Sequence, residues 1–258
     1  GYNNGKFKEV EYFLKGLRAP VFKLLNSTSK EKYKCPICNY HGPFMDKKNR
    51  HDAKCPKCGE LERARLAMLV LNEIYDKQKA SETDVLHISP ENFLRKIFKD
   101  KYKSYISSDL YRTDVDHQFD IQSIPYPDNS FDLVITRHTL EQMPKIFKKA
   151  LDEIFRVSKK HVILFEPSFE MGSYAQKLKM LNTDYVRGIP SYLKTKTDLK
   201  IDPAYLMKNS ANPLNHTACF RATISNKDTR GASNTKIQFV CPQTKTPLEN
   251  RGNYYYSH

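Results

Sequence analysis

Two C-x-x-C pairs constrain the first quarter of the chain more strongly than any other feature. They are Cys35/Cys38 and Cys55/Cys58, and 16 residues separate them. Two thiol pairs at this spacing are typical of a tetrahedral metal site with four cysteine ligands. Asn39 and Gly59 follow the pairs directly, and both residue types tolerate the left-handed backbone of a tight turn. Four protein ligands leave no open position, so the pattern predicts a structural zinc ribbon.

Two disulfides or a redox-active dithiol are the alternative interpretations of these pairs. No secretory signal is visible in the sequence, which disfavours disulfides and favours a cytoplasmic location. The polar stretch 40–54 between the pairs predicts a short hairpin, with His41 and His51 as surface residues or as contacts of acids.

The charge of the chain is distributed unevenly. The net charge is +14 over 258 residues. Residues 1–59 hold 13 Lys/Arg against 5 Asp/Glu, residues 60–171 hold 17 against 19, and residues 172–258 hold 13 against 5. Basic flanks around a nearly neutral middle favour an anionic partner, with nucleic acid among the candidates, although plain solubility also explains them.

No apolar run approaches the length of a membrane span.

Glycine is absent from a long central segment. The chain has nine glycines, and none lies between Gly59 and Gly172. Average usage predicts roughly eight in such a stretch. A glycine-rich phosphate-binding loop is therefore excluded from the middle of the chain.

The chain from residue 61 onward alternates between segments typical of helices and of strands. Such alternation favours an open, mostly parallel α/β sheet with helices on both faces. Ser89 and Pro90 predict the N-cap and first residue of a helix. We expect helices over 61–75, 91–98 and 144–160, and strands over 84–88, 102–109, near 120–121, 131–135, 161–166 and 219–225.

Ligands of open α/β sheets bind outside the carboxyl ends of the strands. Asp109 lies 20 residues after Ser89, at the spacing where an acidic residue binds ribose hydroxyl groups. An aspartate at a strand end is also a common turn residue. The residues expected at this edge are His87–Glu91, Asp109, Asp120, Ile121, Arg137, His138 and Glu166.

A family resemblance is carried by the segment 124–134, IPYPDNSFDLV, and by the HTLE sequence that begins at His138. Both resemble the region around the third and fourth strands of class I S-adenosylmethionine-dependent methyltransferases with a type 11-like core. Residues 154–157 and 161–166 continue the similarity, which covers roughly residues 80–170. The four-cysteine ribbon, with 61–63 and 86–91, resembles a bacterial branch of these enzymes. The resemblance implies a Rossmann-like, mostly parallel seven-stranded sheet with an N-terminal zinc ribbon.

The resemblance also implies S-adenosylmethionine as cofactor. A glycine-rich loop usually follows the first strand of such enzymes, and here the HISPE sequence stands in its place. Glu91 matches a contact of the cofactor's ammonium, Asp109 the ribose-binding acid, and Asp120 the acceptor of the adenine amino group, with Ile121 against the ring. The candidate cofactor-binding residues are thus His87, Ser89, Glu91, Asp109, Asp120, Ile121 and Arg137.

Methyl transfer is an in-line displacement, so alignment of the acceptor does much of the work. An oxygen or nitrogen acceptor also needs a base, for which His138, Glu141 and Tyr185 are candidates.

The expected domains are an N-terminal helical segment (1–30), a zinc ribbon (31–60), a methyltransferase-like domain (61–236) and a C-terminal tail (237–258). Residues 172–215 are expected to form a lid or substrate wall. The tail resembles the opening of another zinc-ribbon module but holds only Cys241, so we expect a strand or hairpin there without a second metal.

Two functions from different classes fit these features. One is an active methyltransferase for an anionic acceptor: RNA, a phosphorylated metabolite, a glycan or a peptide. The alternative is a catalytically inactive, methyltransferase-like zinc-ribbon module that binds nucleic acid or protein. The glycine-free middle favours the alternative, whereas Asp109, Asp120 and the segment 124–134 favour the enzyme.

Overall fold

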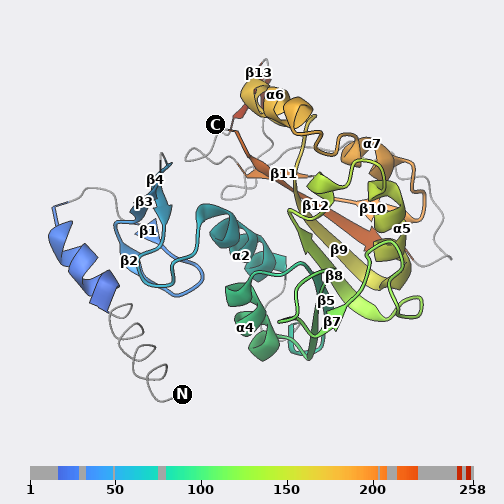
Figure 1. Cartoon of the computed structure of the whole chain (residues 1–258), viewed down its shortest axis with the longest axis horizontal. Helices are drawn as coiled ribbons and strands as arrows, with labels where there is room; N and C mark the ends of the chain where they lie inside the picture. The colour runs from blue at the N-terminus through green and yellow to red at the C-terminus, as the bar shows by residue number, and fades with distance from the viewer. Residues whose placement is uncertain are drawn as a thin grey trace. The chain divides into compact units, whose positions relative to one another are not determined.

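The computed structural model describes residues 17–28, 33–48, 50–74, 80–202, 204–207, 214–225, 249–251 and 254–256 (Figure 1). The chain divides into two units, Gly1–Glu73 and Ile74–His258, and each is described by itself. No helix in the described part of the chain is long and apolar enough to cross a membrane.

The first unit consists of a helix over residues 17–25, two small antiparallel hairpins and a longer helix. The hairpin predicted between the cysteine pairs is confirmed as β3–β4, in which Met45 pairs with Lys54. The helix predicted over 61–75 is also confirmed. The elements are β1 (Tyr33–Lys34), β2 (His41–Gly42), β3 (Met45–Lys47), β4 (Arg50–Lys54) and α2 (Glu62–Ile74).

Arg65 of α2 fixes this helix against the hairpins. Its guanidinium donates to the carbonyl oxygens of Ala53 at 2.8 Å and Glu60 at 2.9 Å, and it lies 4.4 Å from the centre of the Phe44 ring. At the other end of the unit, Arg18 donates to the carbonyl of Pro56 at 2.7 Å. Two half-buried cationic side chains thus satisfy backbone oxygens that a small hairpin leaves unpaired.

The second unit is built on one mixed sheet. Seven strands follow the order β10-β12-β9-β8-β5-β6-β7, and β11 also pairs with β12. The pairs among β5, β6, β7, β8 and β9 are parallel, and β12 is antiparallel to its neighbours. The strands are β5 (Asp84–Ile88), β6 (Ser104–Asp109), β7 (His117–Gln118), β8 (Phe131–Arg137), β9 (Ser158–Pro167), β10 (Leu199–Ile201), β11 (Tyr205–Met207) and β12 (Thr217–Ile224).

Helices cover both faces of this sheet, as the alternation predicted. Leu86 and Val134 belong to the same core cluster as the buried residues of α5 (Phe147–Val157). The neighbouring residue His87 points to the opposite face, where its ring lies 5.6 Å from that of Phe98 in α4 (Asn92–Lys101). Successive side chains of a strand point to opposite faces, so α4 and α5 lie on opposite sides of the sheet. The unit is therefore a Rossmann-like α/β fold.

The remaining elements lie after β8 and β9 or in the tail. A short 3₁₀ helix, η1 (Leu140–Gln142), follows β8, and α6 (Tyr174–Asn182) and α7 (Ile189–Lys194) occupy the segment expected to form a lid. In the tail, β13 (Glu249–Arg251) and β14 (Tyr254–Tyr256) pair with each other, whereas Cys241 lies outside the described residues.

Several predicted boundaries are wrong. The second helix begins at Asn92, so Glu91 is its N-cap instead of Ser89, and that cap makes no side-chain hydrogen bond. The helix predicted over 144–160 covers only 147–157, because Ser158 to Lys160 already belong to β9. The third strand comes before Asp120, at 117–118. In each case a tertiary hydrogen bond or strand pairing overrides local propensity.

Arg156, near the end of α5, connects this helix to the segment 124–134. Its guanidinium donates to the carbonyl oxygens of Ile124 at 2.9 Å and Tyr126 at 2.8 Å. Glu153 accepts the backbone N–H of Ile124 at 2.9 Å and also binds Arg156. The irregular chain before β8 is thereby held by one turn of α5. This turn fixes the position at which β8 begins, and with it the position of the edge at which β8 ends.

We expect Arg156→Met to lower the free energy of unfolding by about 1–3 kcal/mol, because two backbone carbonyls lose a charged donor while the aliphatic stem remains. Urea unfolding followed by circular dichroism measures the change. Lys149→Met is the matched control, since Lys149 is an exposed residue of the same helix. Equal stability of the two variants would contradict the clamping role of Arg156.

Candidate functional site

The four cysteines of the first unit lie in two turns of the same construction. The N–H of Cys35 donates to the carbonyl of Tyr40 at 2.8 Å, and that of Cys55 donates to the carbonyl of Glu60 at 3.0 Å. Asn39 and Gly59 have φ angles of 56° and 80°, as their positions after the pairs predicted. Each turn therefore aims two thiols from one strand end toward the thiols of the other turn.

The spacing of the sulfur atoms matches a tetrahedral site. Cys35 Sγ lies 3.8 Å from Cys58 Sγ, and Cys38 Sγ lies 3.6 Å from Cys55 Sγ. All four sulfurs lie within 4.8 Å of one another. A tetrahedron with metal–sulfur bonds of about 2.3 Å, the length for zinc, has edges of about 3.8 Å. The donor set and its size thus fit zinc. The nearby His51 is exposed and contacts Asp46, and His41 is also exposed.

The topology of the second unit predicts a crevice outside the carboxyl ends of β5 and β8. The chain leaves β5 toward β6 on one side and leaves β8 toward β9 on the other, although β5 and β8 are neighbours. The loops after these two strands therefore diverge, and such a point is where open α/β sheets bind ligands. The loop after β5 and the end of β8 at Arg137 border this crevice.

The loop after β5 adopts a glycine-like conformation without glycine. Ser89 has a φ angle of 51°, in the left-handed region that L-residues rarely adopt. Its N–H donates to the carbonyl of Ser108 at 2.7 Å, which ties the loop to the end of β6. Its hydroxyl also contacts the carboxylate of Asp109. These two contacts hold Ser89 in the strained conformation, so the backbone path of a glycine loop is kept.

Asp109 lies at the end of β6, beside this loop. Its Oδ1 accepts the N–H groups of Tyr111 at 2.9 Å and Arg112 at 3.1 Å. Partial burial opposes ionisation, but these backbone hydrogen bonds outweigh it and lower the pKa of Asp109 below its ordinary value. The carboxylate is therefore ionised at neutral pH, and it acts both as a turn residue and as an acceptor at the edge.

An ion pair joins the two sides of the crevice. Arg137 at the end of β8 binds Glu91, which follows β5. The Arg137 side chain is 8% exposed and the Glu91 side chain 31%. Glu91 Oε2 is buried and has no hydrogen-bond partner among the described residues. A charged oxygen in that state favours a site that a donor group of a ligand completes.

The other predicted cofactor residues lie in different surroundings. His87 is buried against Phe98, with Nδ1 2.9 Å from the Tyr105 hydroxyl, and burial lowers its pKa to about 3. Asp120 accepts the N–H of Gln122 at 2.8 Å in a turn after β7. Ile121 is 5% exposed and belongs to the core cluster. The structure thus brings Ser89, Glu91, Asp109 and Arg137 together at one edge, and it places His87 inside the α4 face of the core.

His138 and Glu141 form a network beyond the end of β8. His138 Nδ1 lies 3.0 Å from Glu141 Oε2, and His138 Nε2 lies 3.0 Å from the hydroxyl oxygen of Thr217. The side chains of His138 and Glu141 are 10% and 7% exposed. His138 has a φ angle of 51°, and its N–H donates to the carbonyl of Phe165. The histidine is thus fixed between an acid and a hydroxyl group.

The turn that carries this network is held by Glu166 at the end of β9. Its carboxylate accepts the N–H groups of Thr139 at 3.0 Å, Leu140 at 3.2 Å and Glu141 at 3.1 Å. The side chain is fully buried. Burial, and secondly the charge of Glu141, raise the pKa of Glu166 to about 8. Sequence reasoning placed Glu166 at the edge but assigned it no role, although a carboxylate that ends an apolar strand is a signal for one.

Tyr185, the third candidate base, approaches the same turn from the lid segment. The N–H of the next residue, Val186, donates to the carbonyl of Glu141 at 2.9 Å. The segment 172–215, predicted to be a lid or substrate wall, is therefore anchored to the turn that carries Glu141.

Sequence reasoning missed two features of the edge. Arg112 binds the carbonyl of Pro90 and the side chain of Asn92, so it fastens the loop after β5 to the loop after β6. Leu110 and Tyr111 are apolar residues with 44% and 83% exposure beside Asp109. Both side chains therefore lie exposed at the carboxyl edge of the sheet.

Comparisons with known proteins agree with this architecture. Residues 77–165 match the family model described as a methyltransferase domain. This part of the Rossmann-like sheet is thus similar to methyltransferase domains. No curated protein matches the chain.

Solved structures that match part of the chain include three from different organisms. Magnesium protoporphyrin IX methyltransferase from Synechocystis, with bound SAH, is 11% identical, with a TM-score of 0.49 and coverage of 64% of this chain and 86% of that one. A protein from Pyrococcus horikoshii is 13% identical, with a TM-score of 0.48 and coverage of 64% and 92%. A SAM-dependent methyltransferase from Archaeoglobus fulgidus is 13% identical, with a TM-score of 0.45 and coverage of 63% and 94%.

The raised pKa of Glu166 predicts a particular pH dependence of stability. The folded state holds the proton more tightly than the unfolded state, in which the pKa is near its ordinary value of 4.5. The stabilisation is complete below that value and is lost as the pH rises through about 8, with a slope of up to about 1.4 kcal/mol per pH unit. Urea unfolding between pH 5 and 9 measures this slope.

Glu166→Gln should remove this pH dependence and lower the free energy of unfolding by about 1–3 kcal/mol, because an amide nitrogen cannot accept a backbone N–H. Glu82→Gln is the control, since Glu82 is exposed. If the Glu166 variant kept the wild-type pH profile, the ionisation of another group would be responsible.

Proposed function

We propose that the unit Ile74–His258 is an S-adenosylmethionine-dependent methyltransferase. The observation that carries this proposal is the set of groups at the diverging strand ends: an ionised Asp109, a left-handed Ser89, and the Glu91–Arg137 pair. The match of residues 77–165 to a methyltransferase domain supports the same reaction class.

The Glu91–Arg137 pair suits the methionine portion of the cofactor. That portion carries an ammonium and a carboxylate group on one carbon atom. Glu91 would bind the ammonium with its unpartnered Oε2, and Arg137 would bind the carboxylate. A bound zwitterion replaces one buried ion pair by two, so no charge is left uncompensated.

Asp109 and its neighbours suit the nucleoside portion. An ionised aspartate at the end of the second strand of the domain is an acceptor for ribose hydroxyl groups. Leu110 or Tyr111 would cover one face of the adenine ring, and Asp120 in the next loop would accept from its amino group. The assignments of Asp120 and Ile121 both follow the family resemblance. Ile121 is itself buried in the core cluster.

His138 is the proposed base for an acceptor that must lose a proton. When bound, the sulfonium of the cofactor supplies an electrophilic methyl group. A hydrogen bond from Nδ1 to Glu141 keeps Nε2 of His138 as the proton acceptor, and Nε2 receives the proton through the Thr217 hydroxyl. Glu141 thus orients the base, and Tyr185 in the lid would contact the acceptor.

We further propose that Cys35, Cys38, Cys55 and Cys58 hold a structural zinc ion, because their sulfur atoms have the spacing of a tetrahedral site. Cys35→Ser should abolish the binding of one zinc per chain and cause loss of structure in the N-terminal unit, since metal binding and folding are coupled. Metal analysis and limited proteolysis measure these outcomes. Cys219→Ser is the control, because Cys219 lies in β12 of the other unit. Protein that was purified without chelator but lacked zinc would contradict the assignment.

The cofactor assignment predicts weaker binding in Asp109 variants. Asp109→Ala should weaken S-adenosylmethionine binding by about 1–3 kcal/mol, the cost of losing charge-assisted hydrogen bonds. Asp109→Asn keeps an oxygen for the N–H groups of Tyr111 and Arg112, and it separates the loss of charge from loss of the turn. Isothermal titration calorimetry measures both affinities.

Asp100→Ala is the matched control, because Asp100 is an exposed residue of α4. Equal affinity of wild type and both Asp109 variants would overturn the ribose assignment. Absence of any cofactor binding by the wild-type chain would instead favour the alternative function, a binding module on a methyltransferase-like scaffold.

A further inference from the structure

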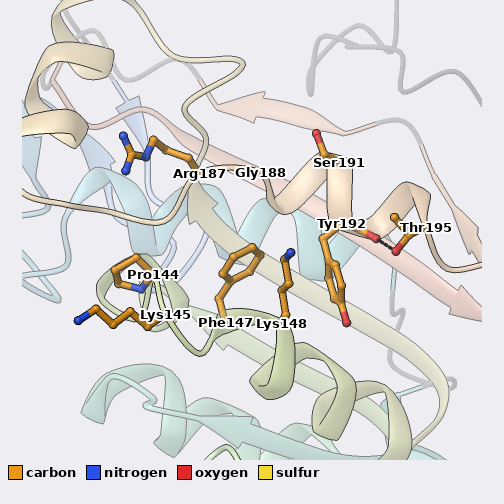
Figure 2. Close-up of a pocket in the computed structure, with 9 residues that line it drawn as sticks. All are labelled: Pro144, Lys145, Phe147, Lys148, Arg187, Gly188, Ser191, Tyr192 and Thr195. Atoms are coloured by element: carbon orange, nitrogen blue, oxygen red, sulfur yellow. Dashed lines mark hydrogen bonds between the residues drawn. The ribbon is translucent and has the colours of Figure 1, made fainter.

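A pocket lies between the start of α5 and α7, in a region to which neither the fold nor the comparisons assign a role (Figure 2). Its volume is about 520 Å³, within the range of small-molecule sites. Its lining residues are Pro144, Lys145, Phe147, Lys148, Arg187, Gly188, Ser191, Tyr192 and Thr195.

All the charged residues that line the pocket are cationic. Lys145, Lys148 and Arg187 line the pocket, and no acidic residue does. Lys145 and Lys148 form no ion pair with any acid in the described ranges, whereas Arg187 approaches only the exposed Asp184, at 3.4 Å. Three cations that share one small concavity repel one another, and an anion that binds between them removes this repulsion.

The carboxylate that contacts the lining residue Tyr192 is already neutralised. Asp152 of α5 accepts a hydrogen bond from the Tyr192 hydroxyl at 2.7 Å and forms an ion pair with Lys196. It therefore does not compensate the cations that line the pocket. The Ser191 hydroxyl makes no hydrogen bond within the described part of the chain, so it is a further donor for an anion.

The pocket also presents aromatic surface. The rings of Phe147 and Tyr192 meet edge to face, with centroids 5.9 Å apart. Figure 2 shows the Lys148 side chain between these two residues, and Lys145 and Arg187 at the opposite end from Thr195. Cations beside aromatic rings fit a ligand with a charged group and a ring-shaped body.

The backbone at Gly188 is fixed by a hydrogen bond and has open space beside it. Gly188 has a φ angle of 89°, and a Cβ atom there would meet nothing within 4 Å. Its N–H donates to Glu170 Oε1 at 2.7 Å. Two residues earlier, Val186 is tied to the carbonyl of Glu141. The pocket is thus anchored to the turn that carries the proposed base.

We propose that this pocket binds the phosphate group of a small-molecule methyl acceptor, a phosphate ester with a ring-shaped body. The identity of the ligand as the acceptor rests on the proposed methyltransferase function, whereas the anion site itself does not. A pocket of this size favours a small molecule over RNA, whose phosphates would need a continuous basic track.

Phenyl phosphate is a minimal probe with both parts of such a ligand. Titration of the full-length, zinc-loaded chain, followed by NMR, should show phenyl phosphate binding more tightly than inorganic phosphate, and phenol binding at least tenfold more weakly than phenyl phosphate. The double variant Lys148→Gln/Arg187→Gln should weaken phenyl phosphate binding at least tenfold.

Lys149→Gln/Lys194→Gln is the matched control. It removes the same charge from α5 and α7, at exposed residues that do not line the pocket. An equal loss of affinity in both double variants, or no binding by wild type, would overturn the anion site. Tighter binding of a single-stranded RNA that is insensitive to Lys148 and Arg187 would overturn it as well.

Calorimetry with S-adenosylmethionine on the same variants separates the two proposals. Unchanged cofactor affinity in the pocket variants is the expected result. If the wild-type chain bound phenyl phosphate but not S-adenosylmethionine, the methyltransferase proposal would fail while the anion site would stand.

Discussion

One buried carboxylate organises the functional edge of the larger unit. Glu166 at the end of β9 accepts three consecutive backbone N–H groups of the turn after β8. That turn carries His138 and Glu141, and through Val186 it also anchors the lid segment and the basic pocket. The proposed base and the proposed acceptor site therefore depend on hydrogen bonds of a single side chain. Its burial carries an electrostatic cost, which appears as a pKa raised to about 8.

In both units an arginine side chain stabilises irregular backbone by hydrogen bonds to its carbonyl oxygens. In the small unit, Arg65 satisfies the carbonyls of Ala53 and Glu60, and in the large unit, Arg156 satisfies those of Ile124 and Tyr126. A guanidinium group offers five donors in a fixed geometry, so one residue holds two segments.

Sequence reasoning predicted the sheet of the second unit and many of the residues at its carboxyl edge, because both depend on local patterns. Apolar strands alternate with amphipathic helices, and strand ends follow from the position of Asp109 and Arg137. It did not predict that Glu91 binds Arg137, since 46 positions separate them and neither carries a local signal of pairing. Boundaries such as the end of α5 at Val157 also depend on partners, because β9 competes for the same residues.

The sequence alone determined the cysteine spacing, the left-handed positions Asn39 and Gly59, and the order of strands and helices between residues 61 and 166, since each rests on residue type and short-range geometry. Only the tertiary structure decided that His87 faces the core, that Ser89 keeps a glycine-like path, and that Lys148 and Arg187 share one pocket. These features arise where segments far apart in sequence pack together. Their energies depend on burial and on neighbouring charges, which no single segment specifies.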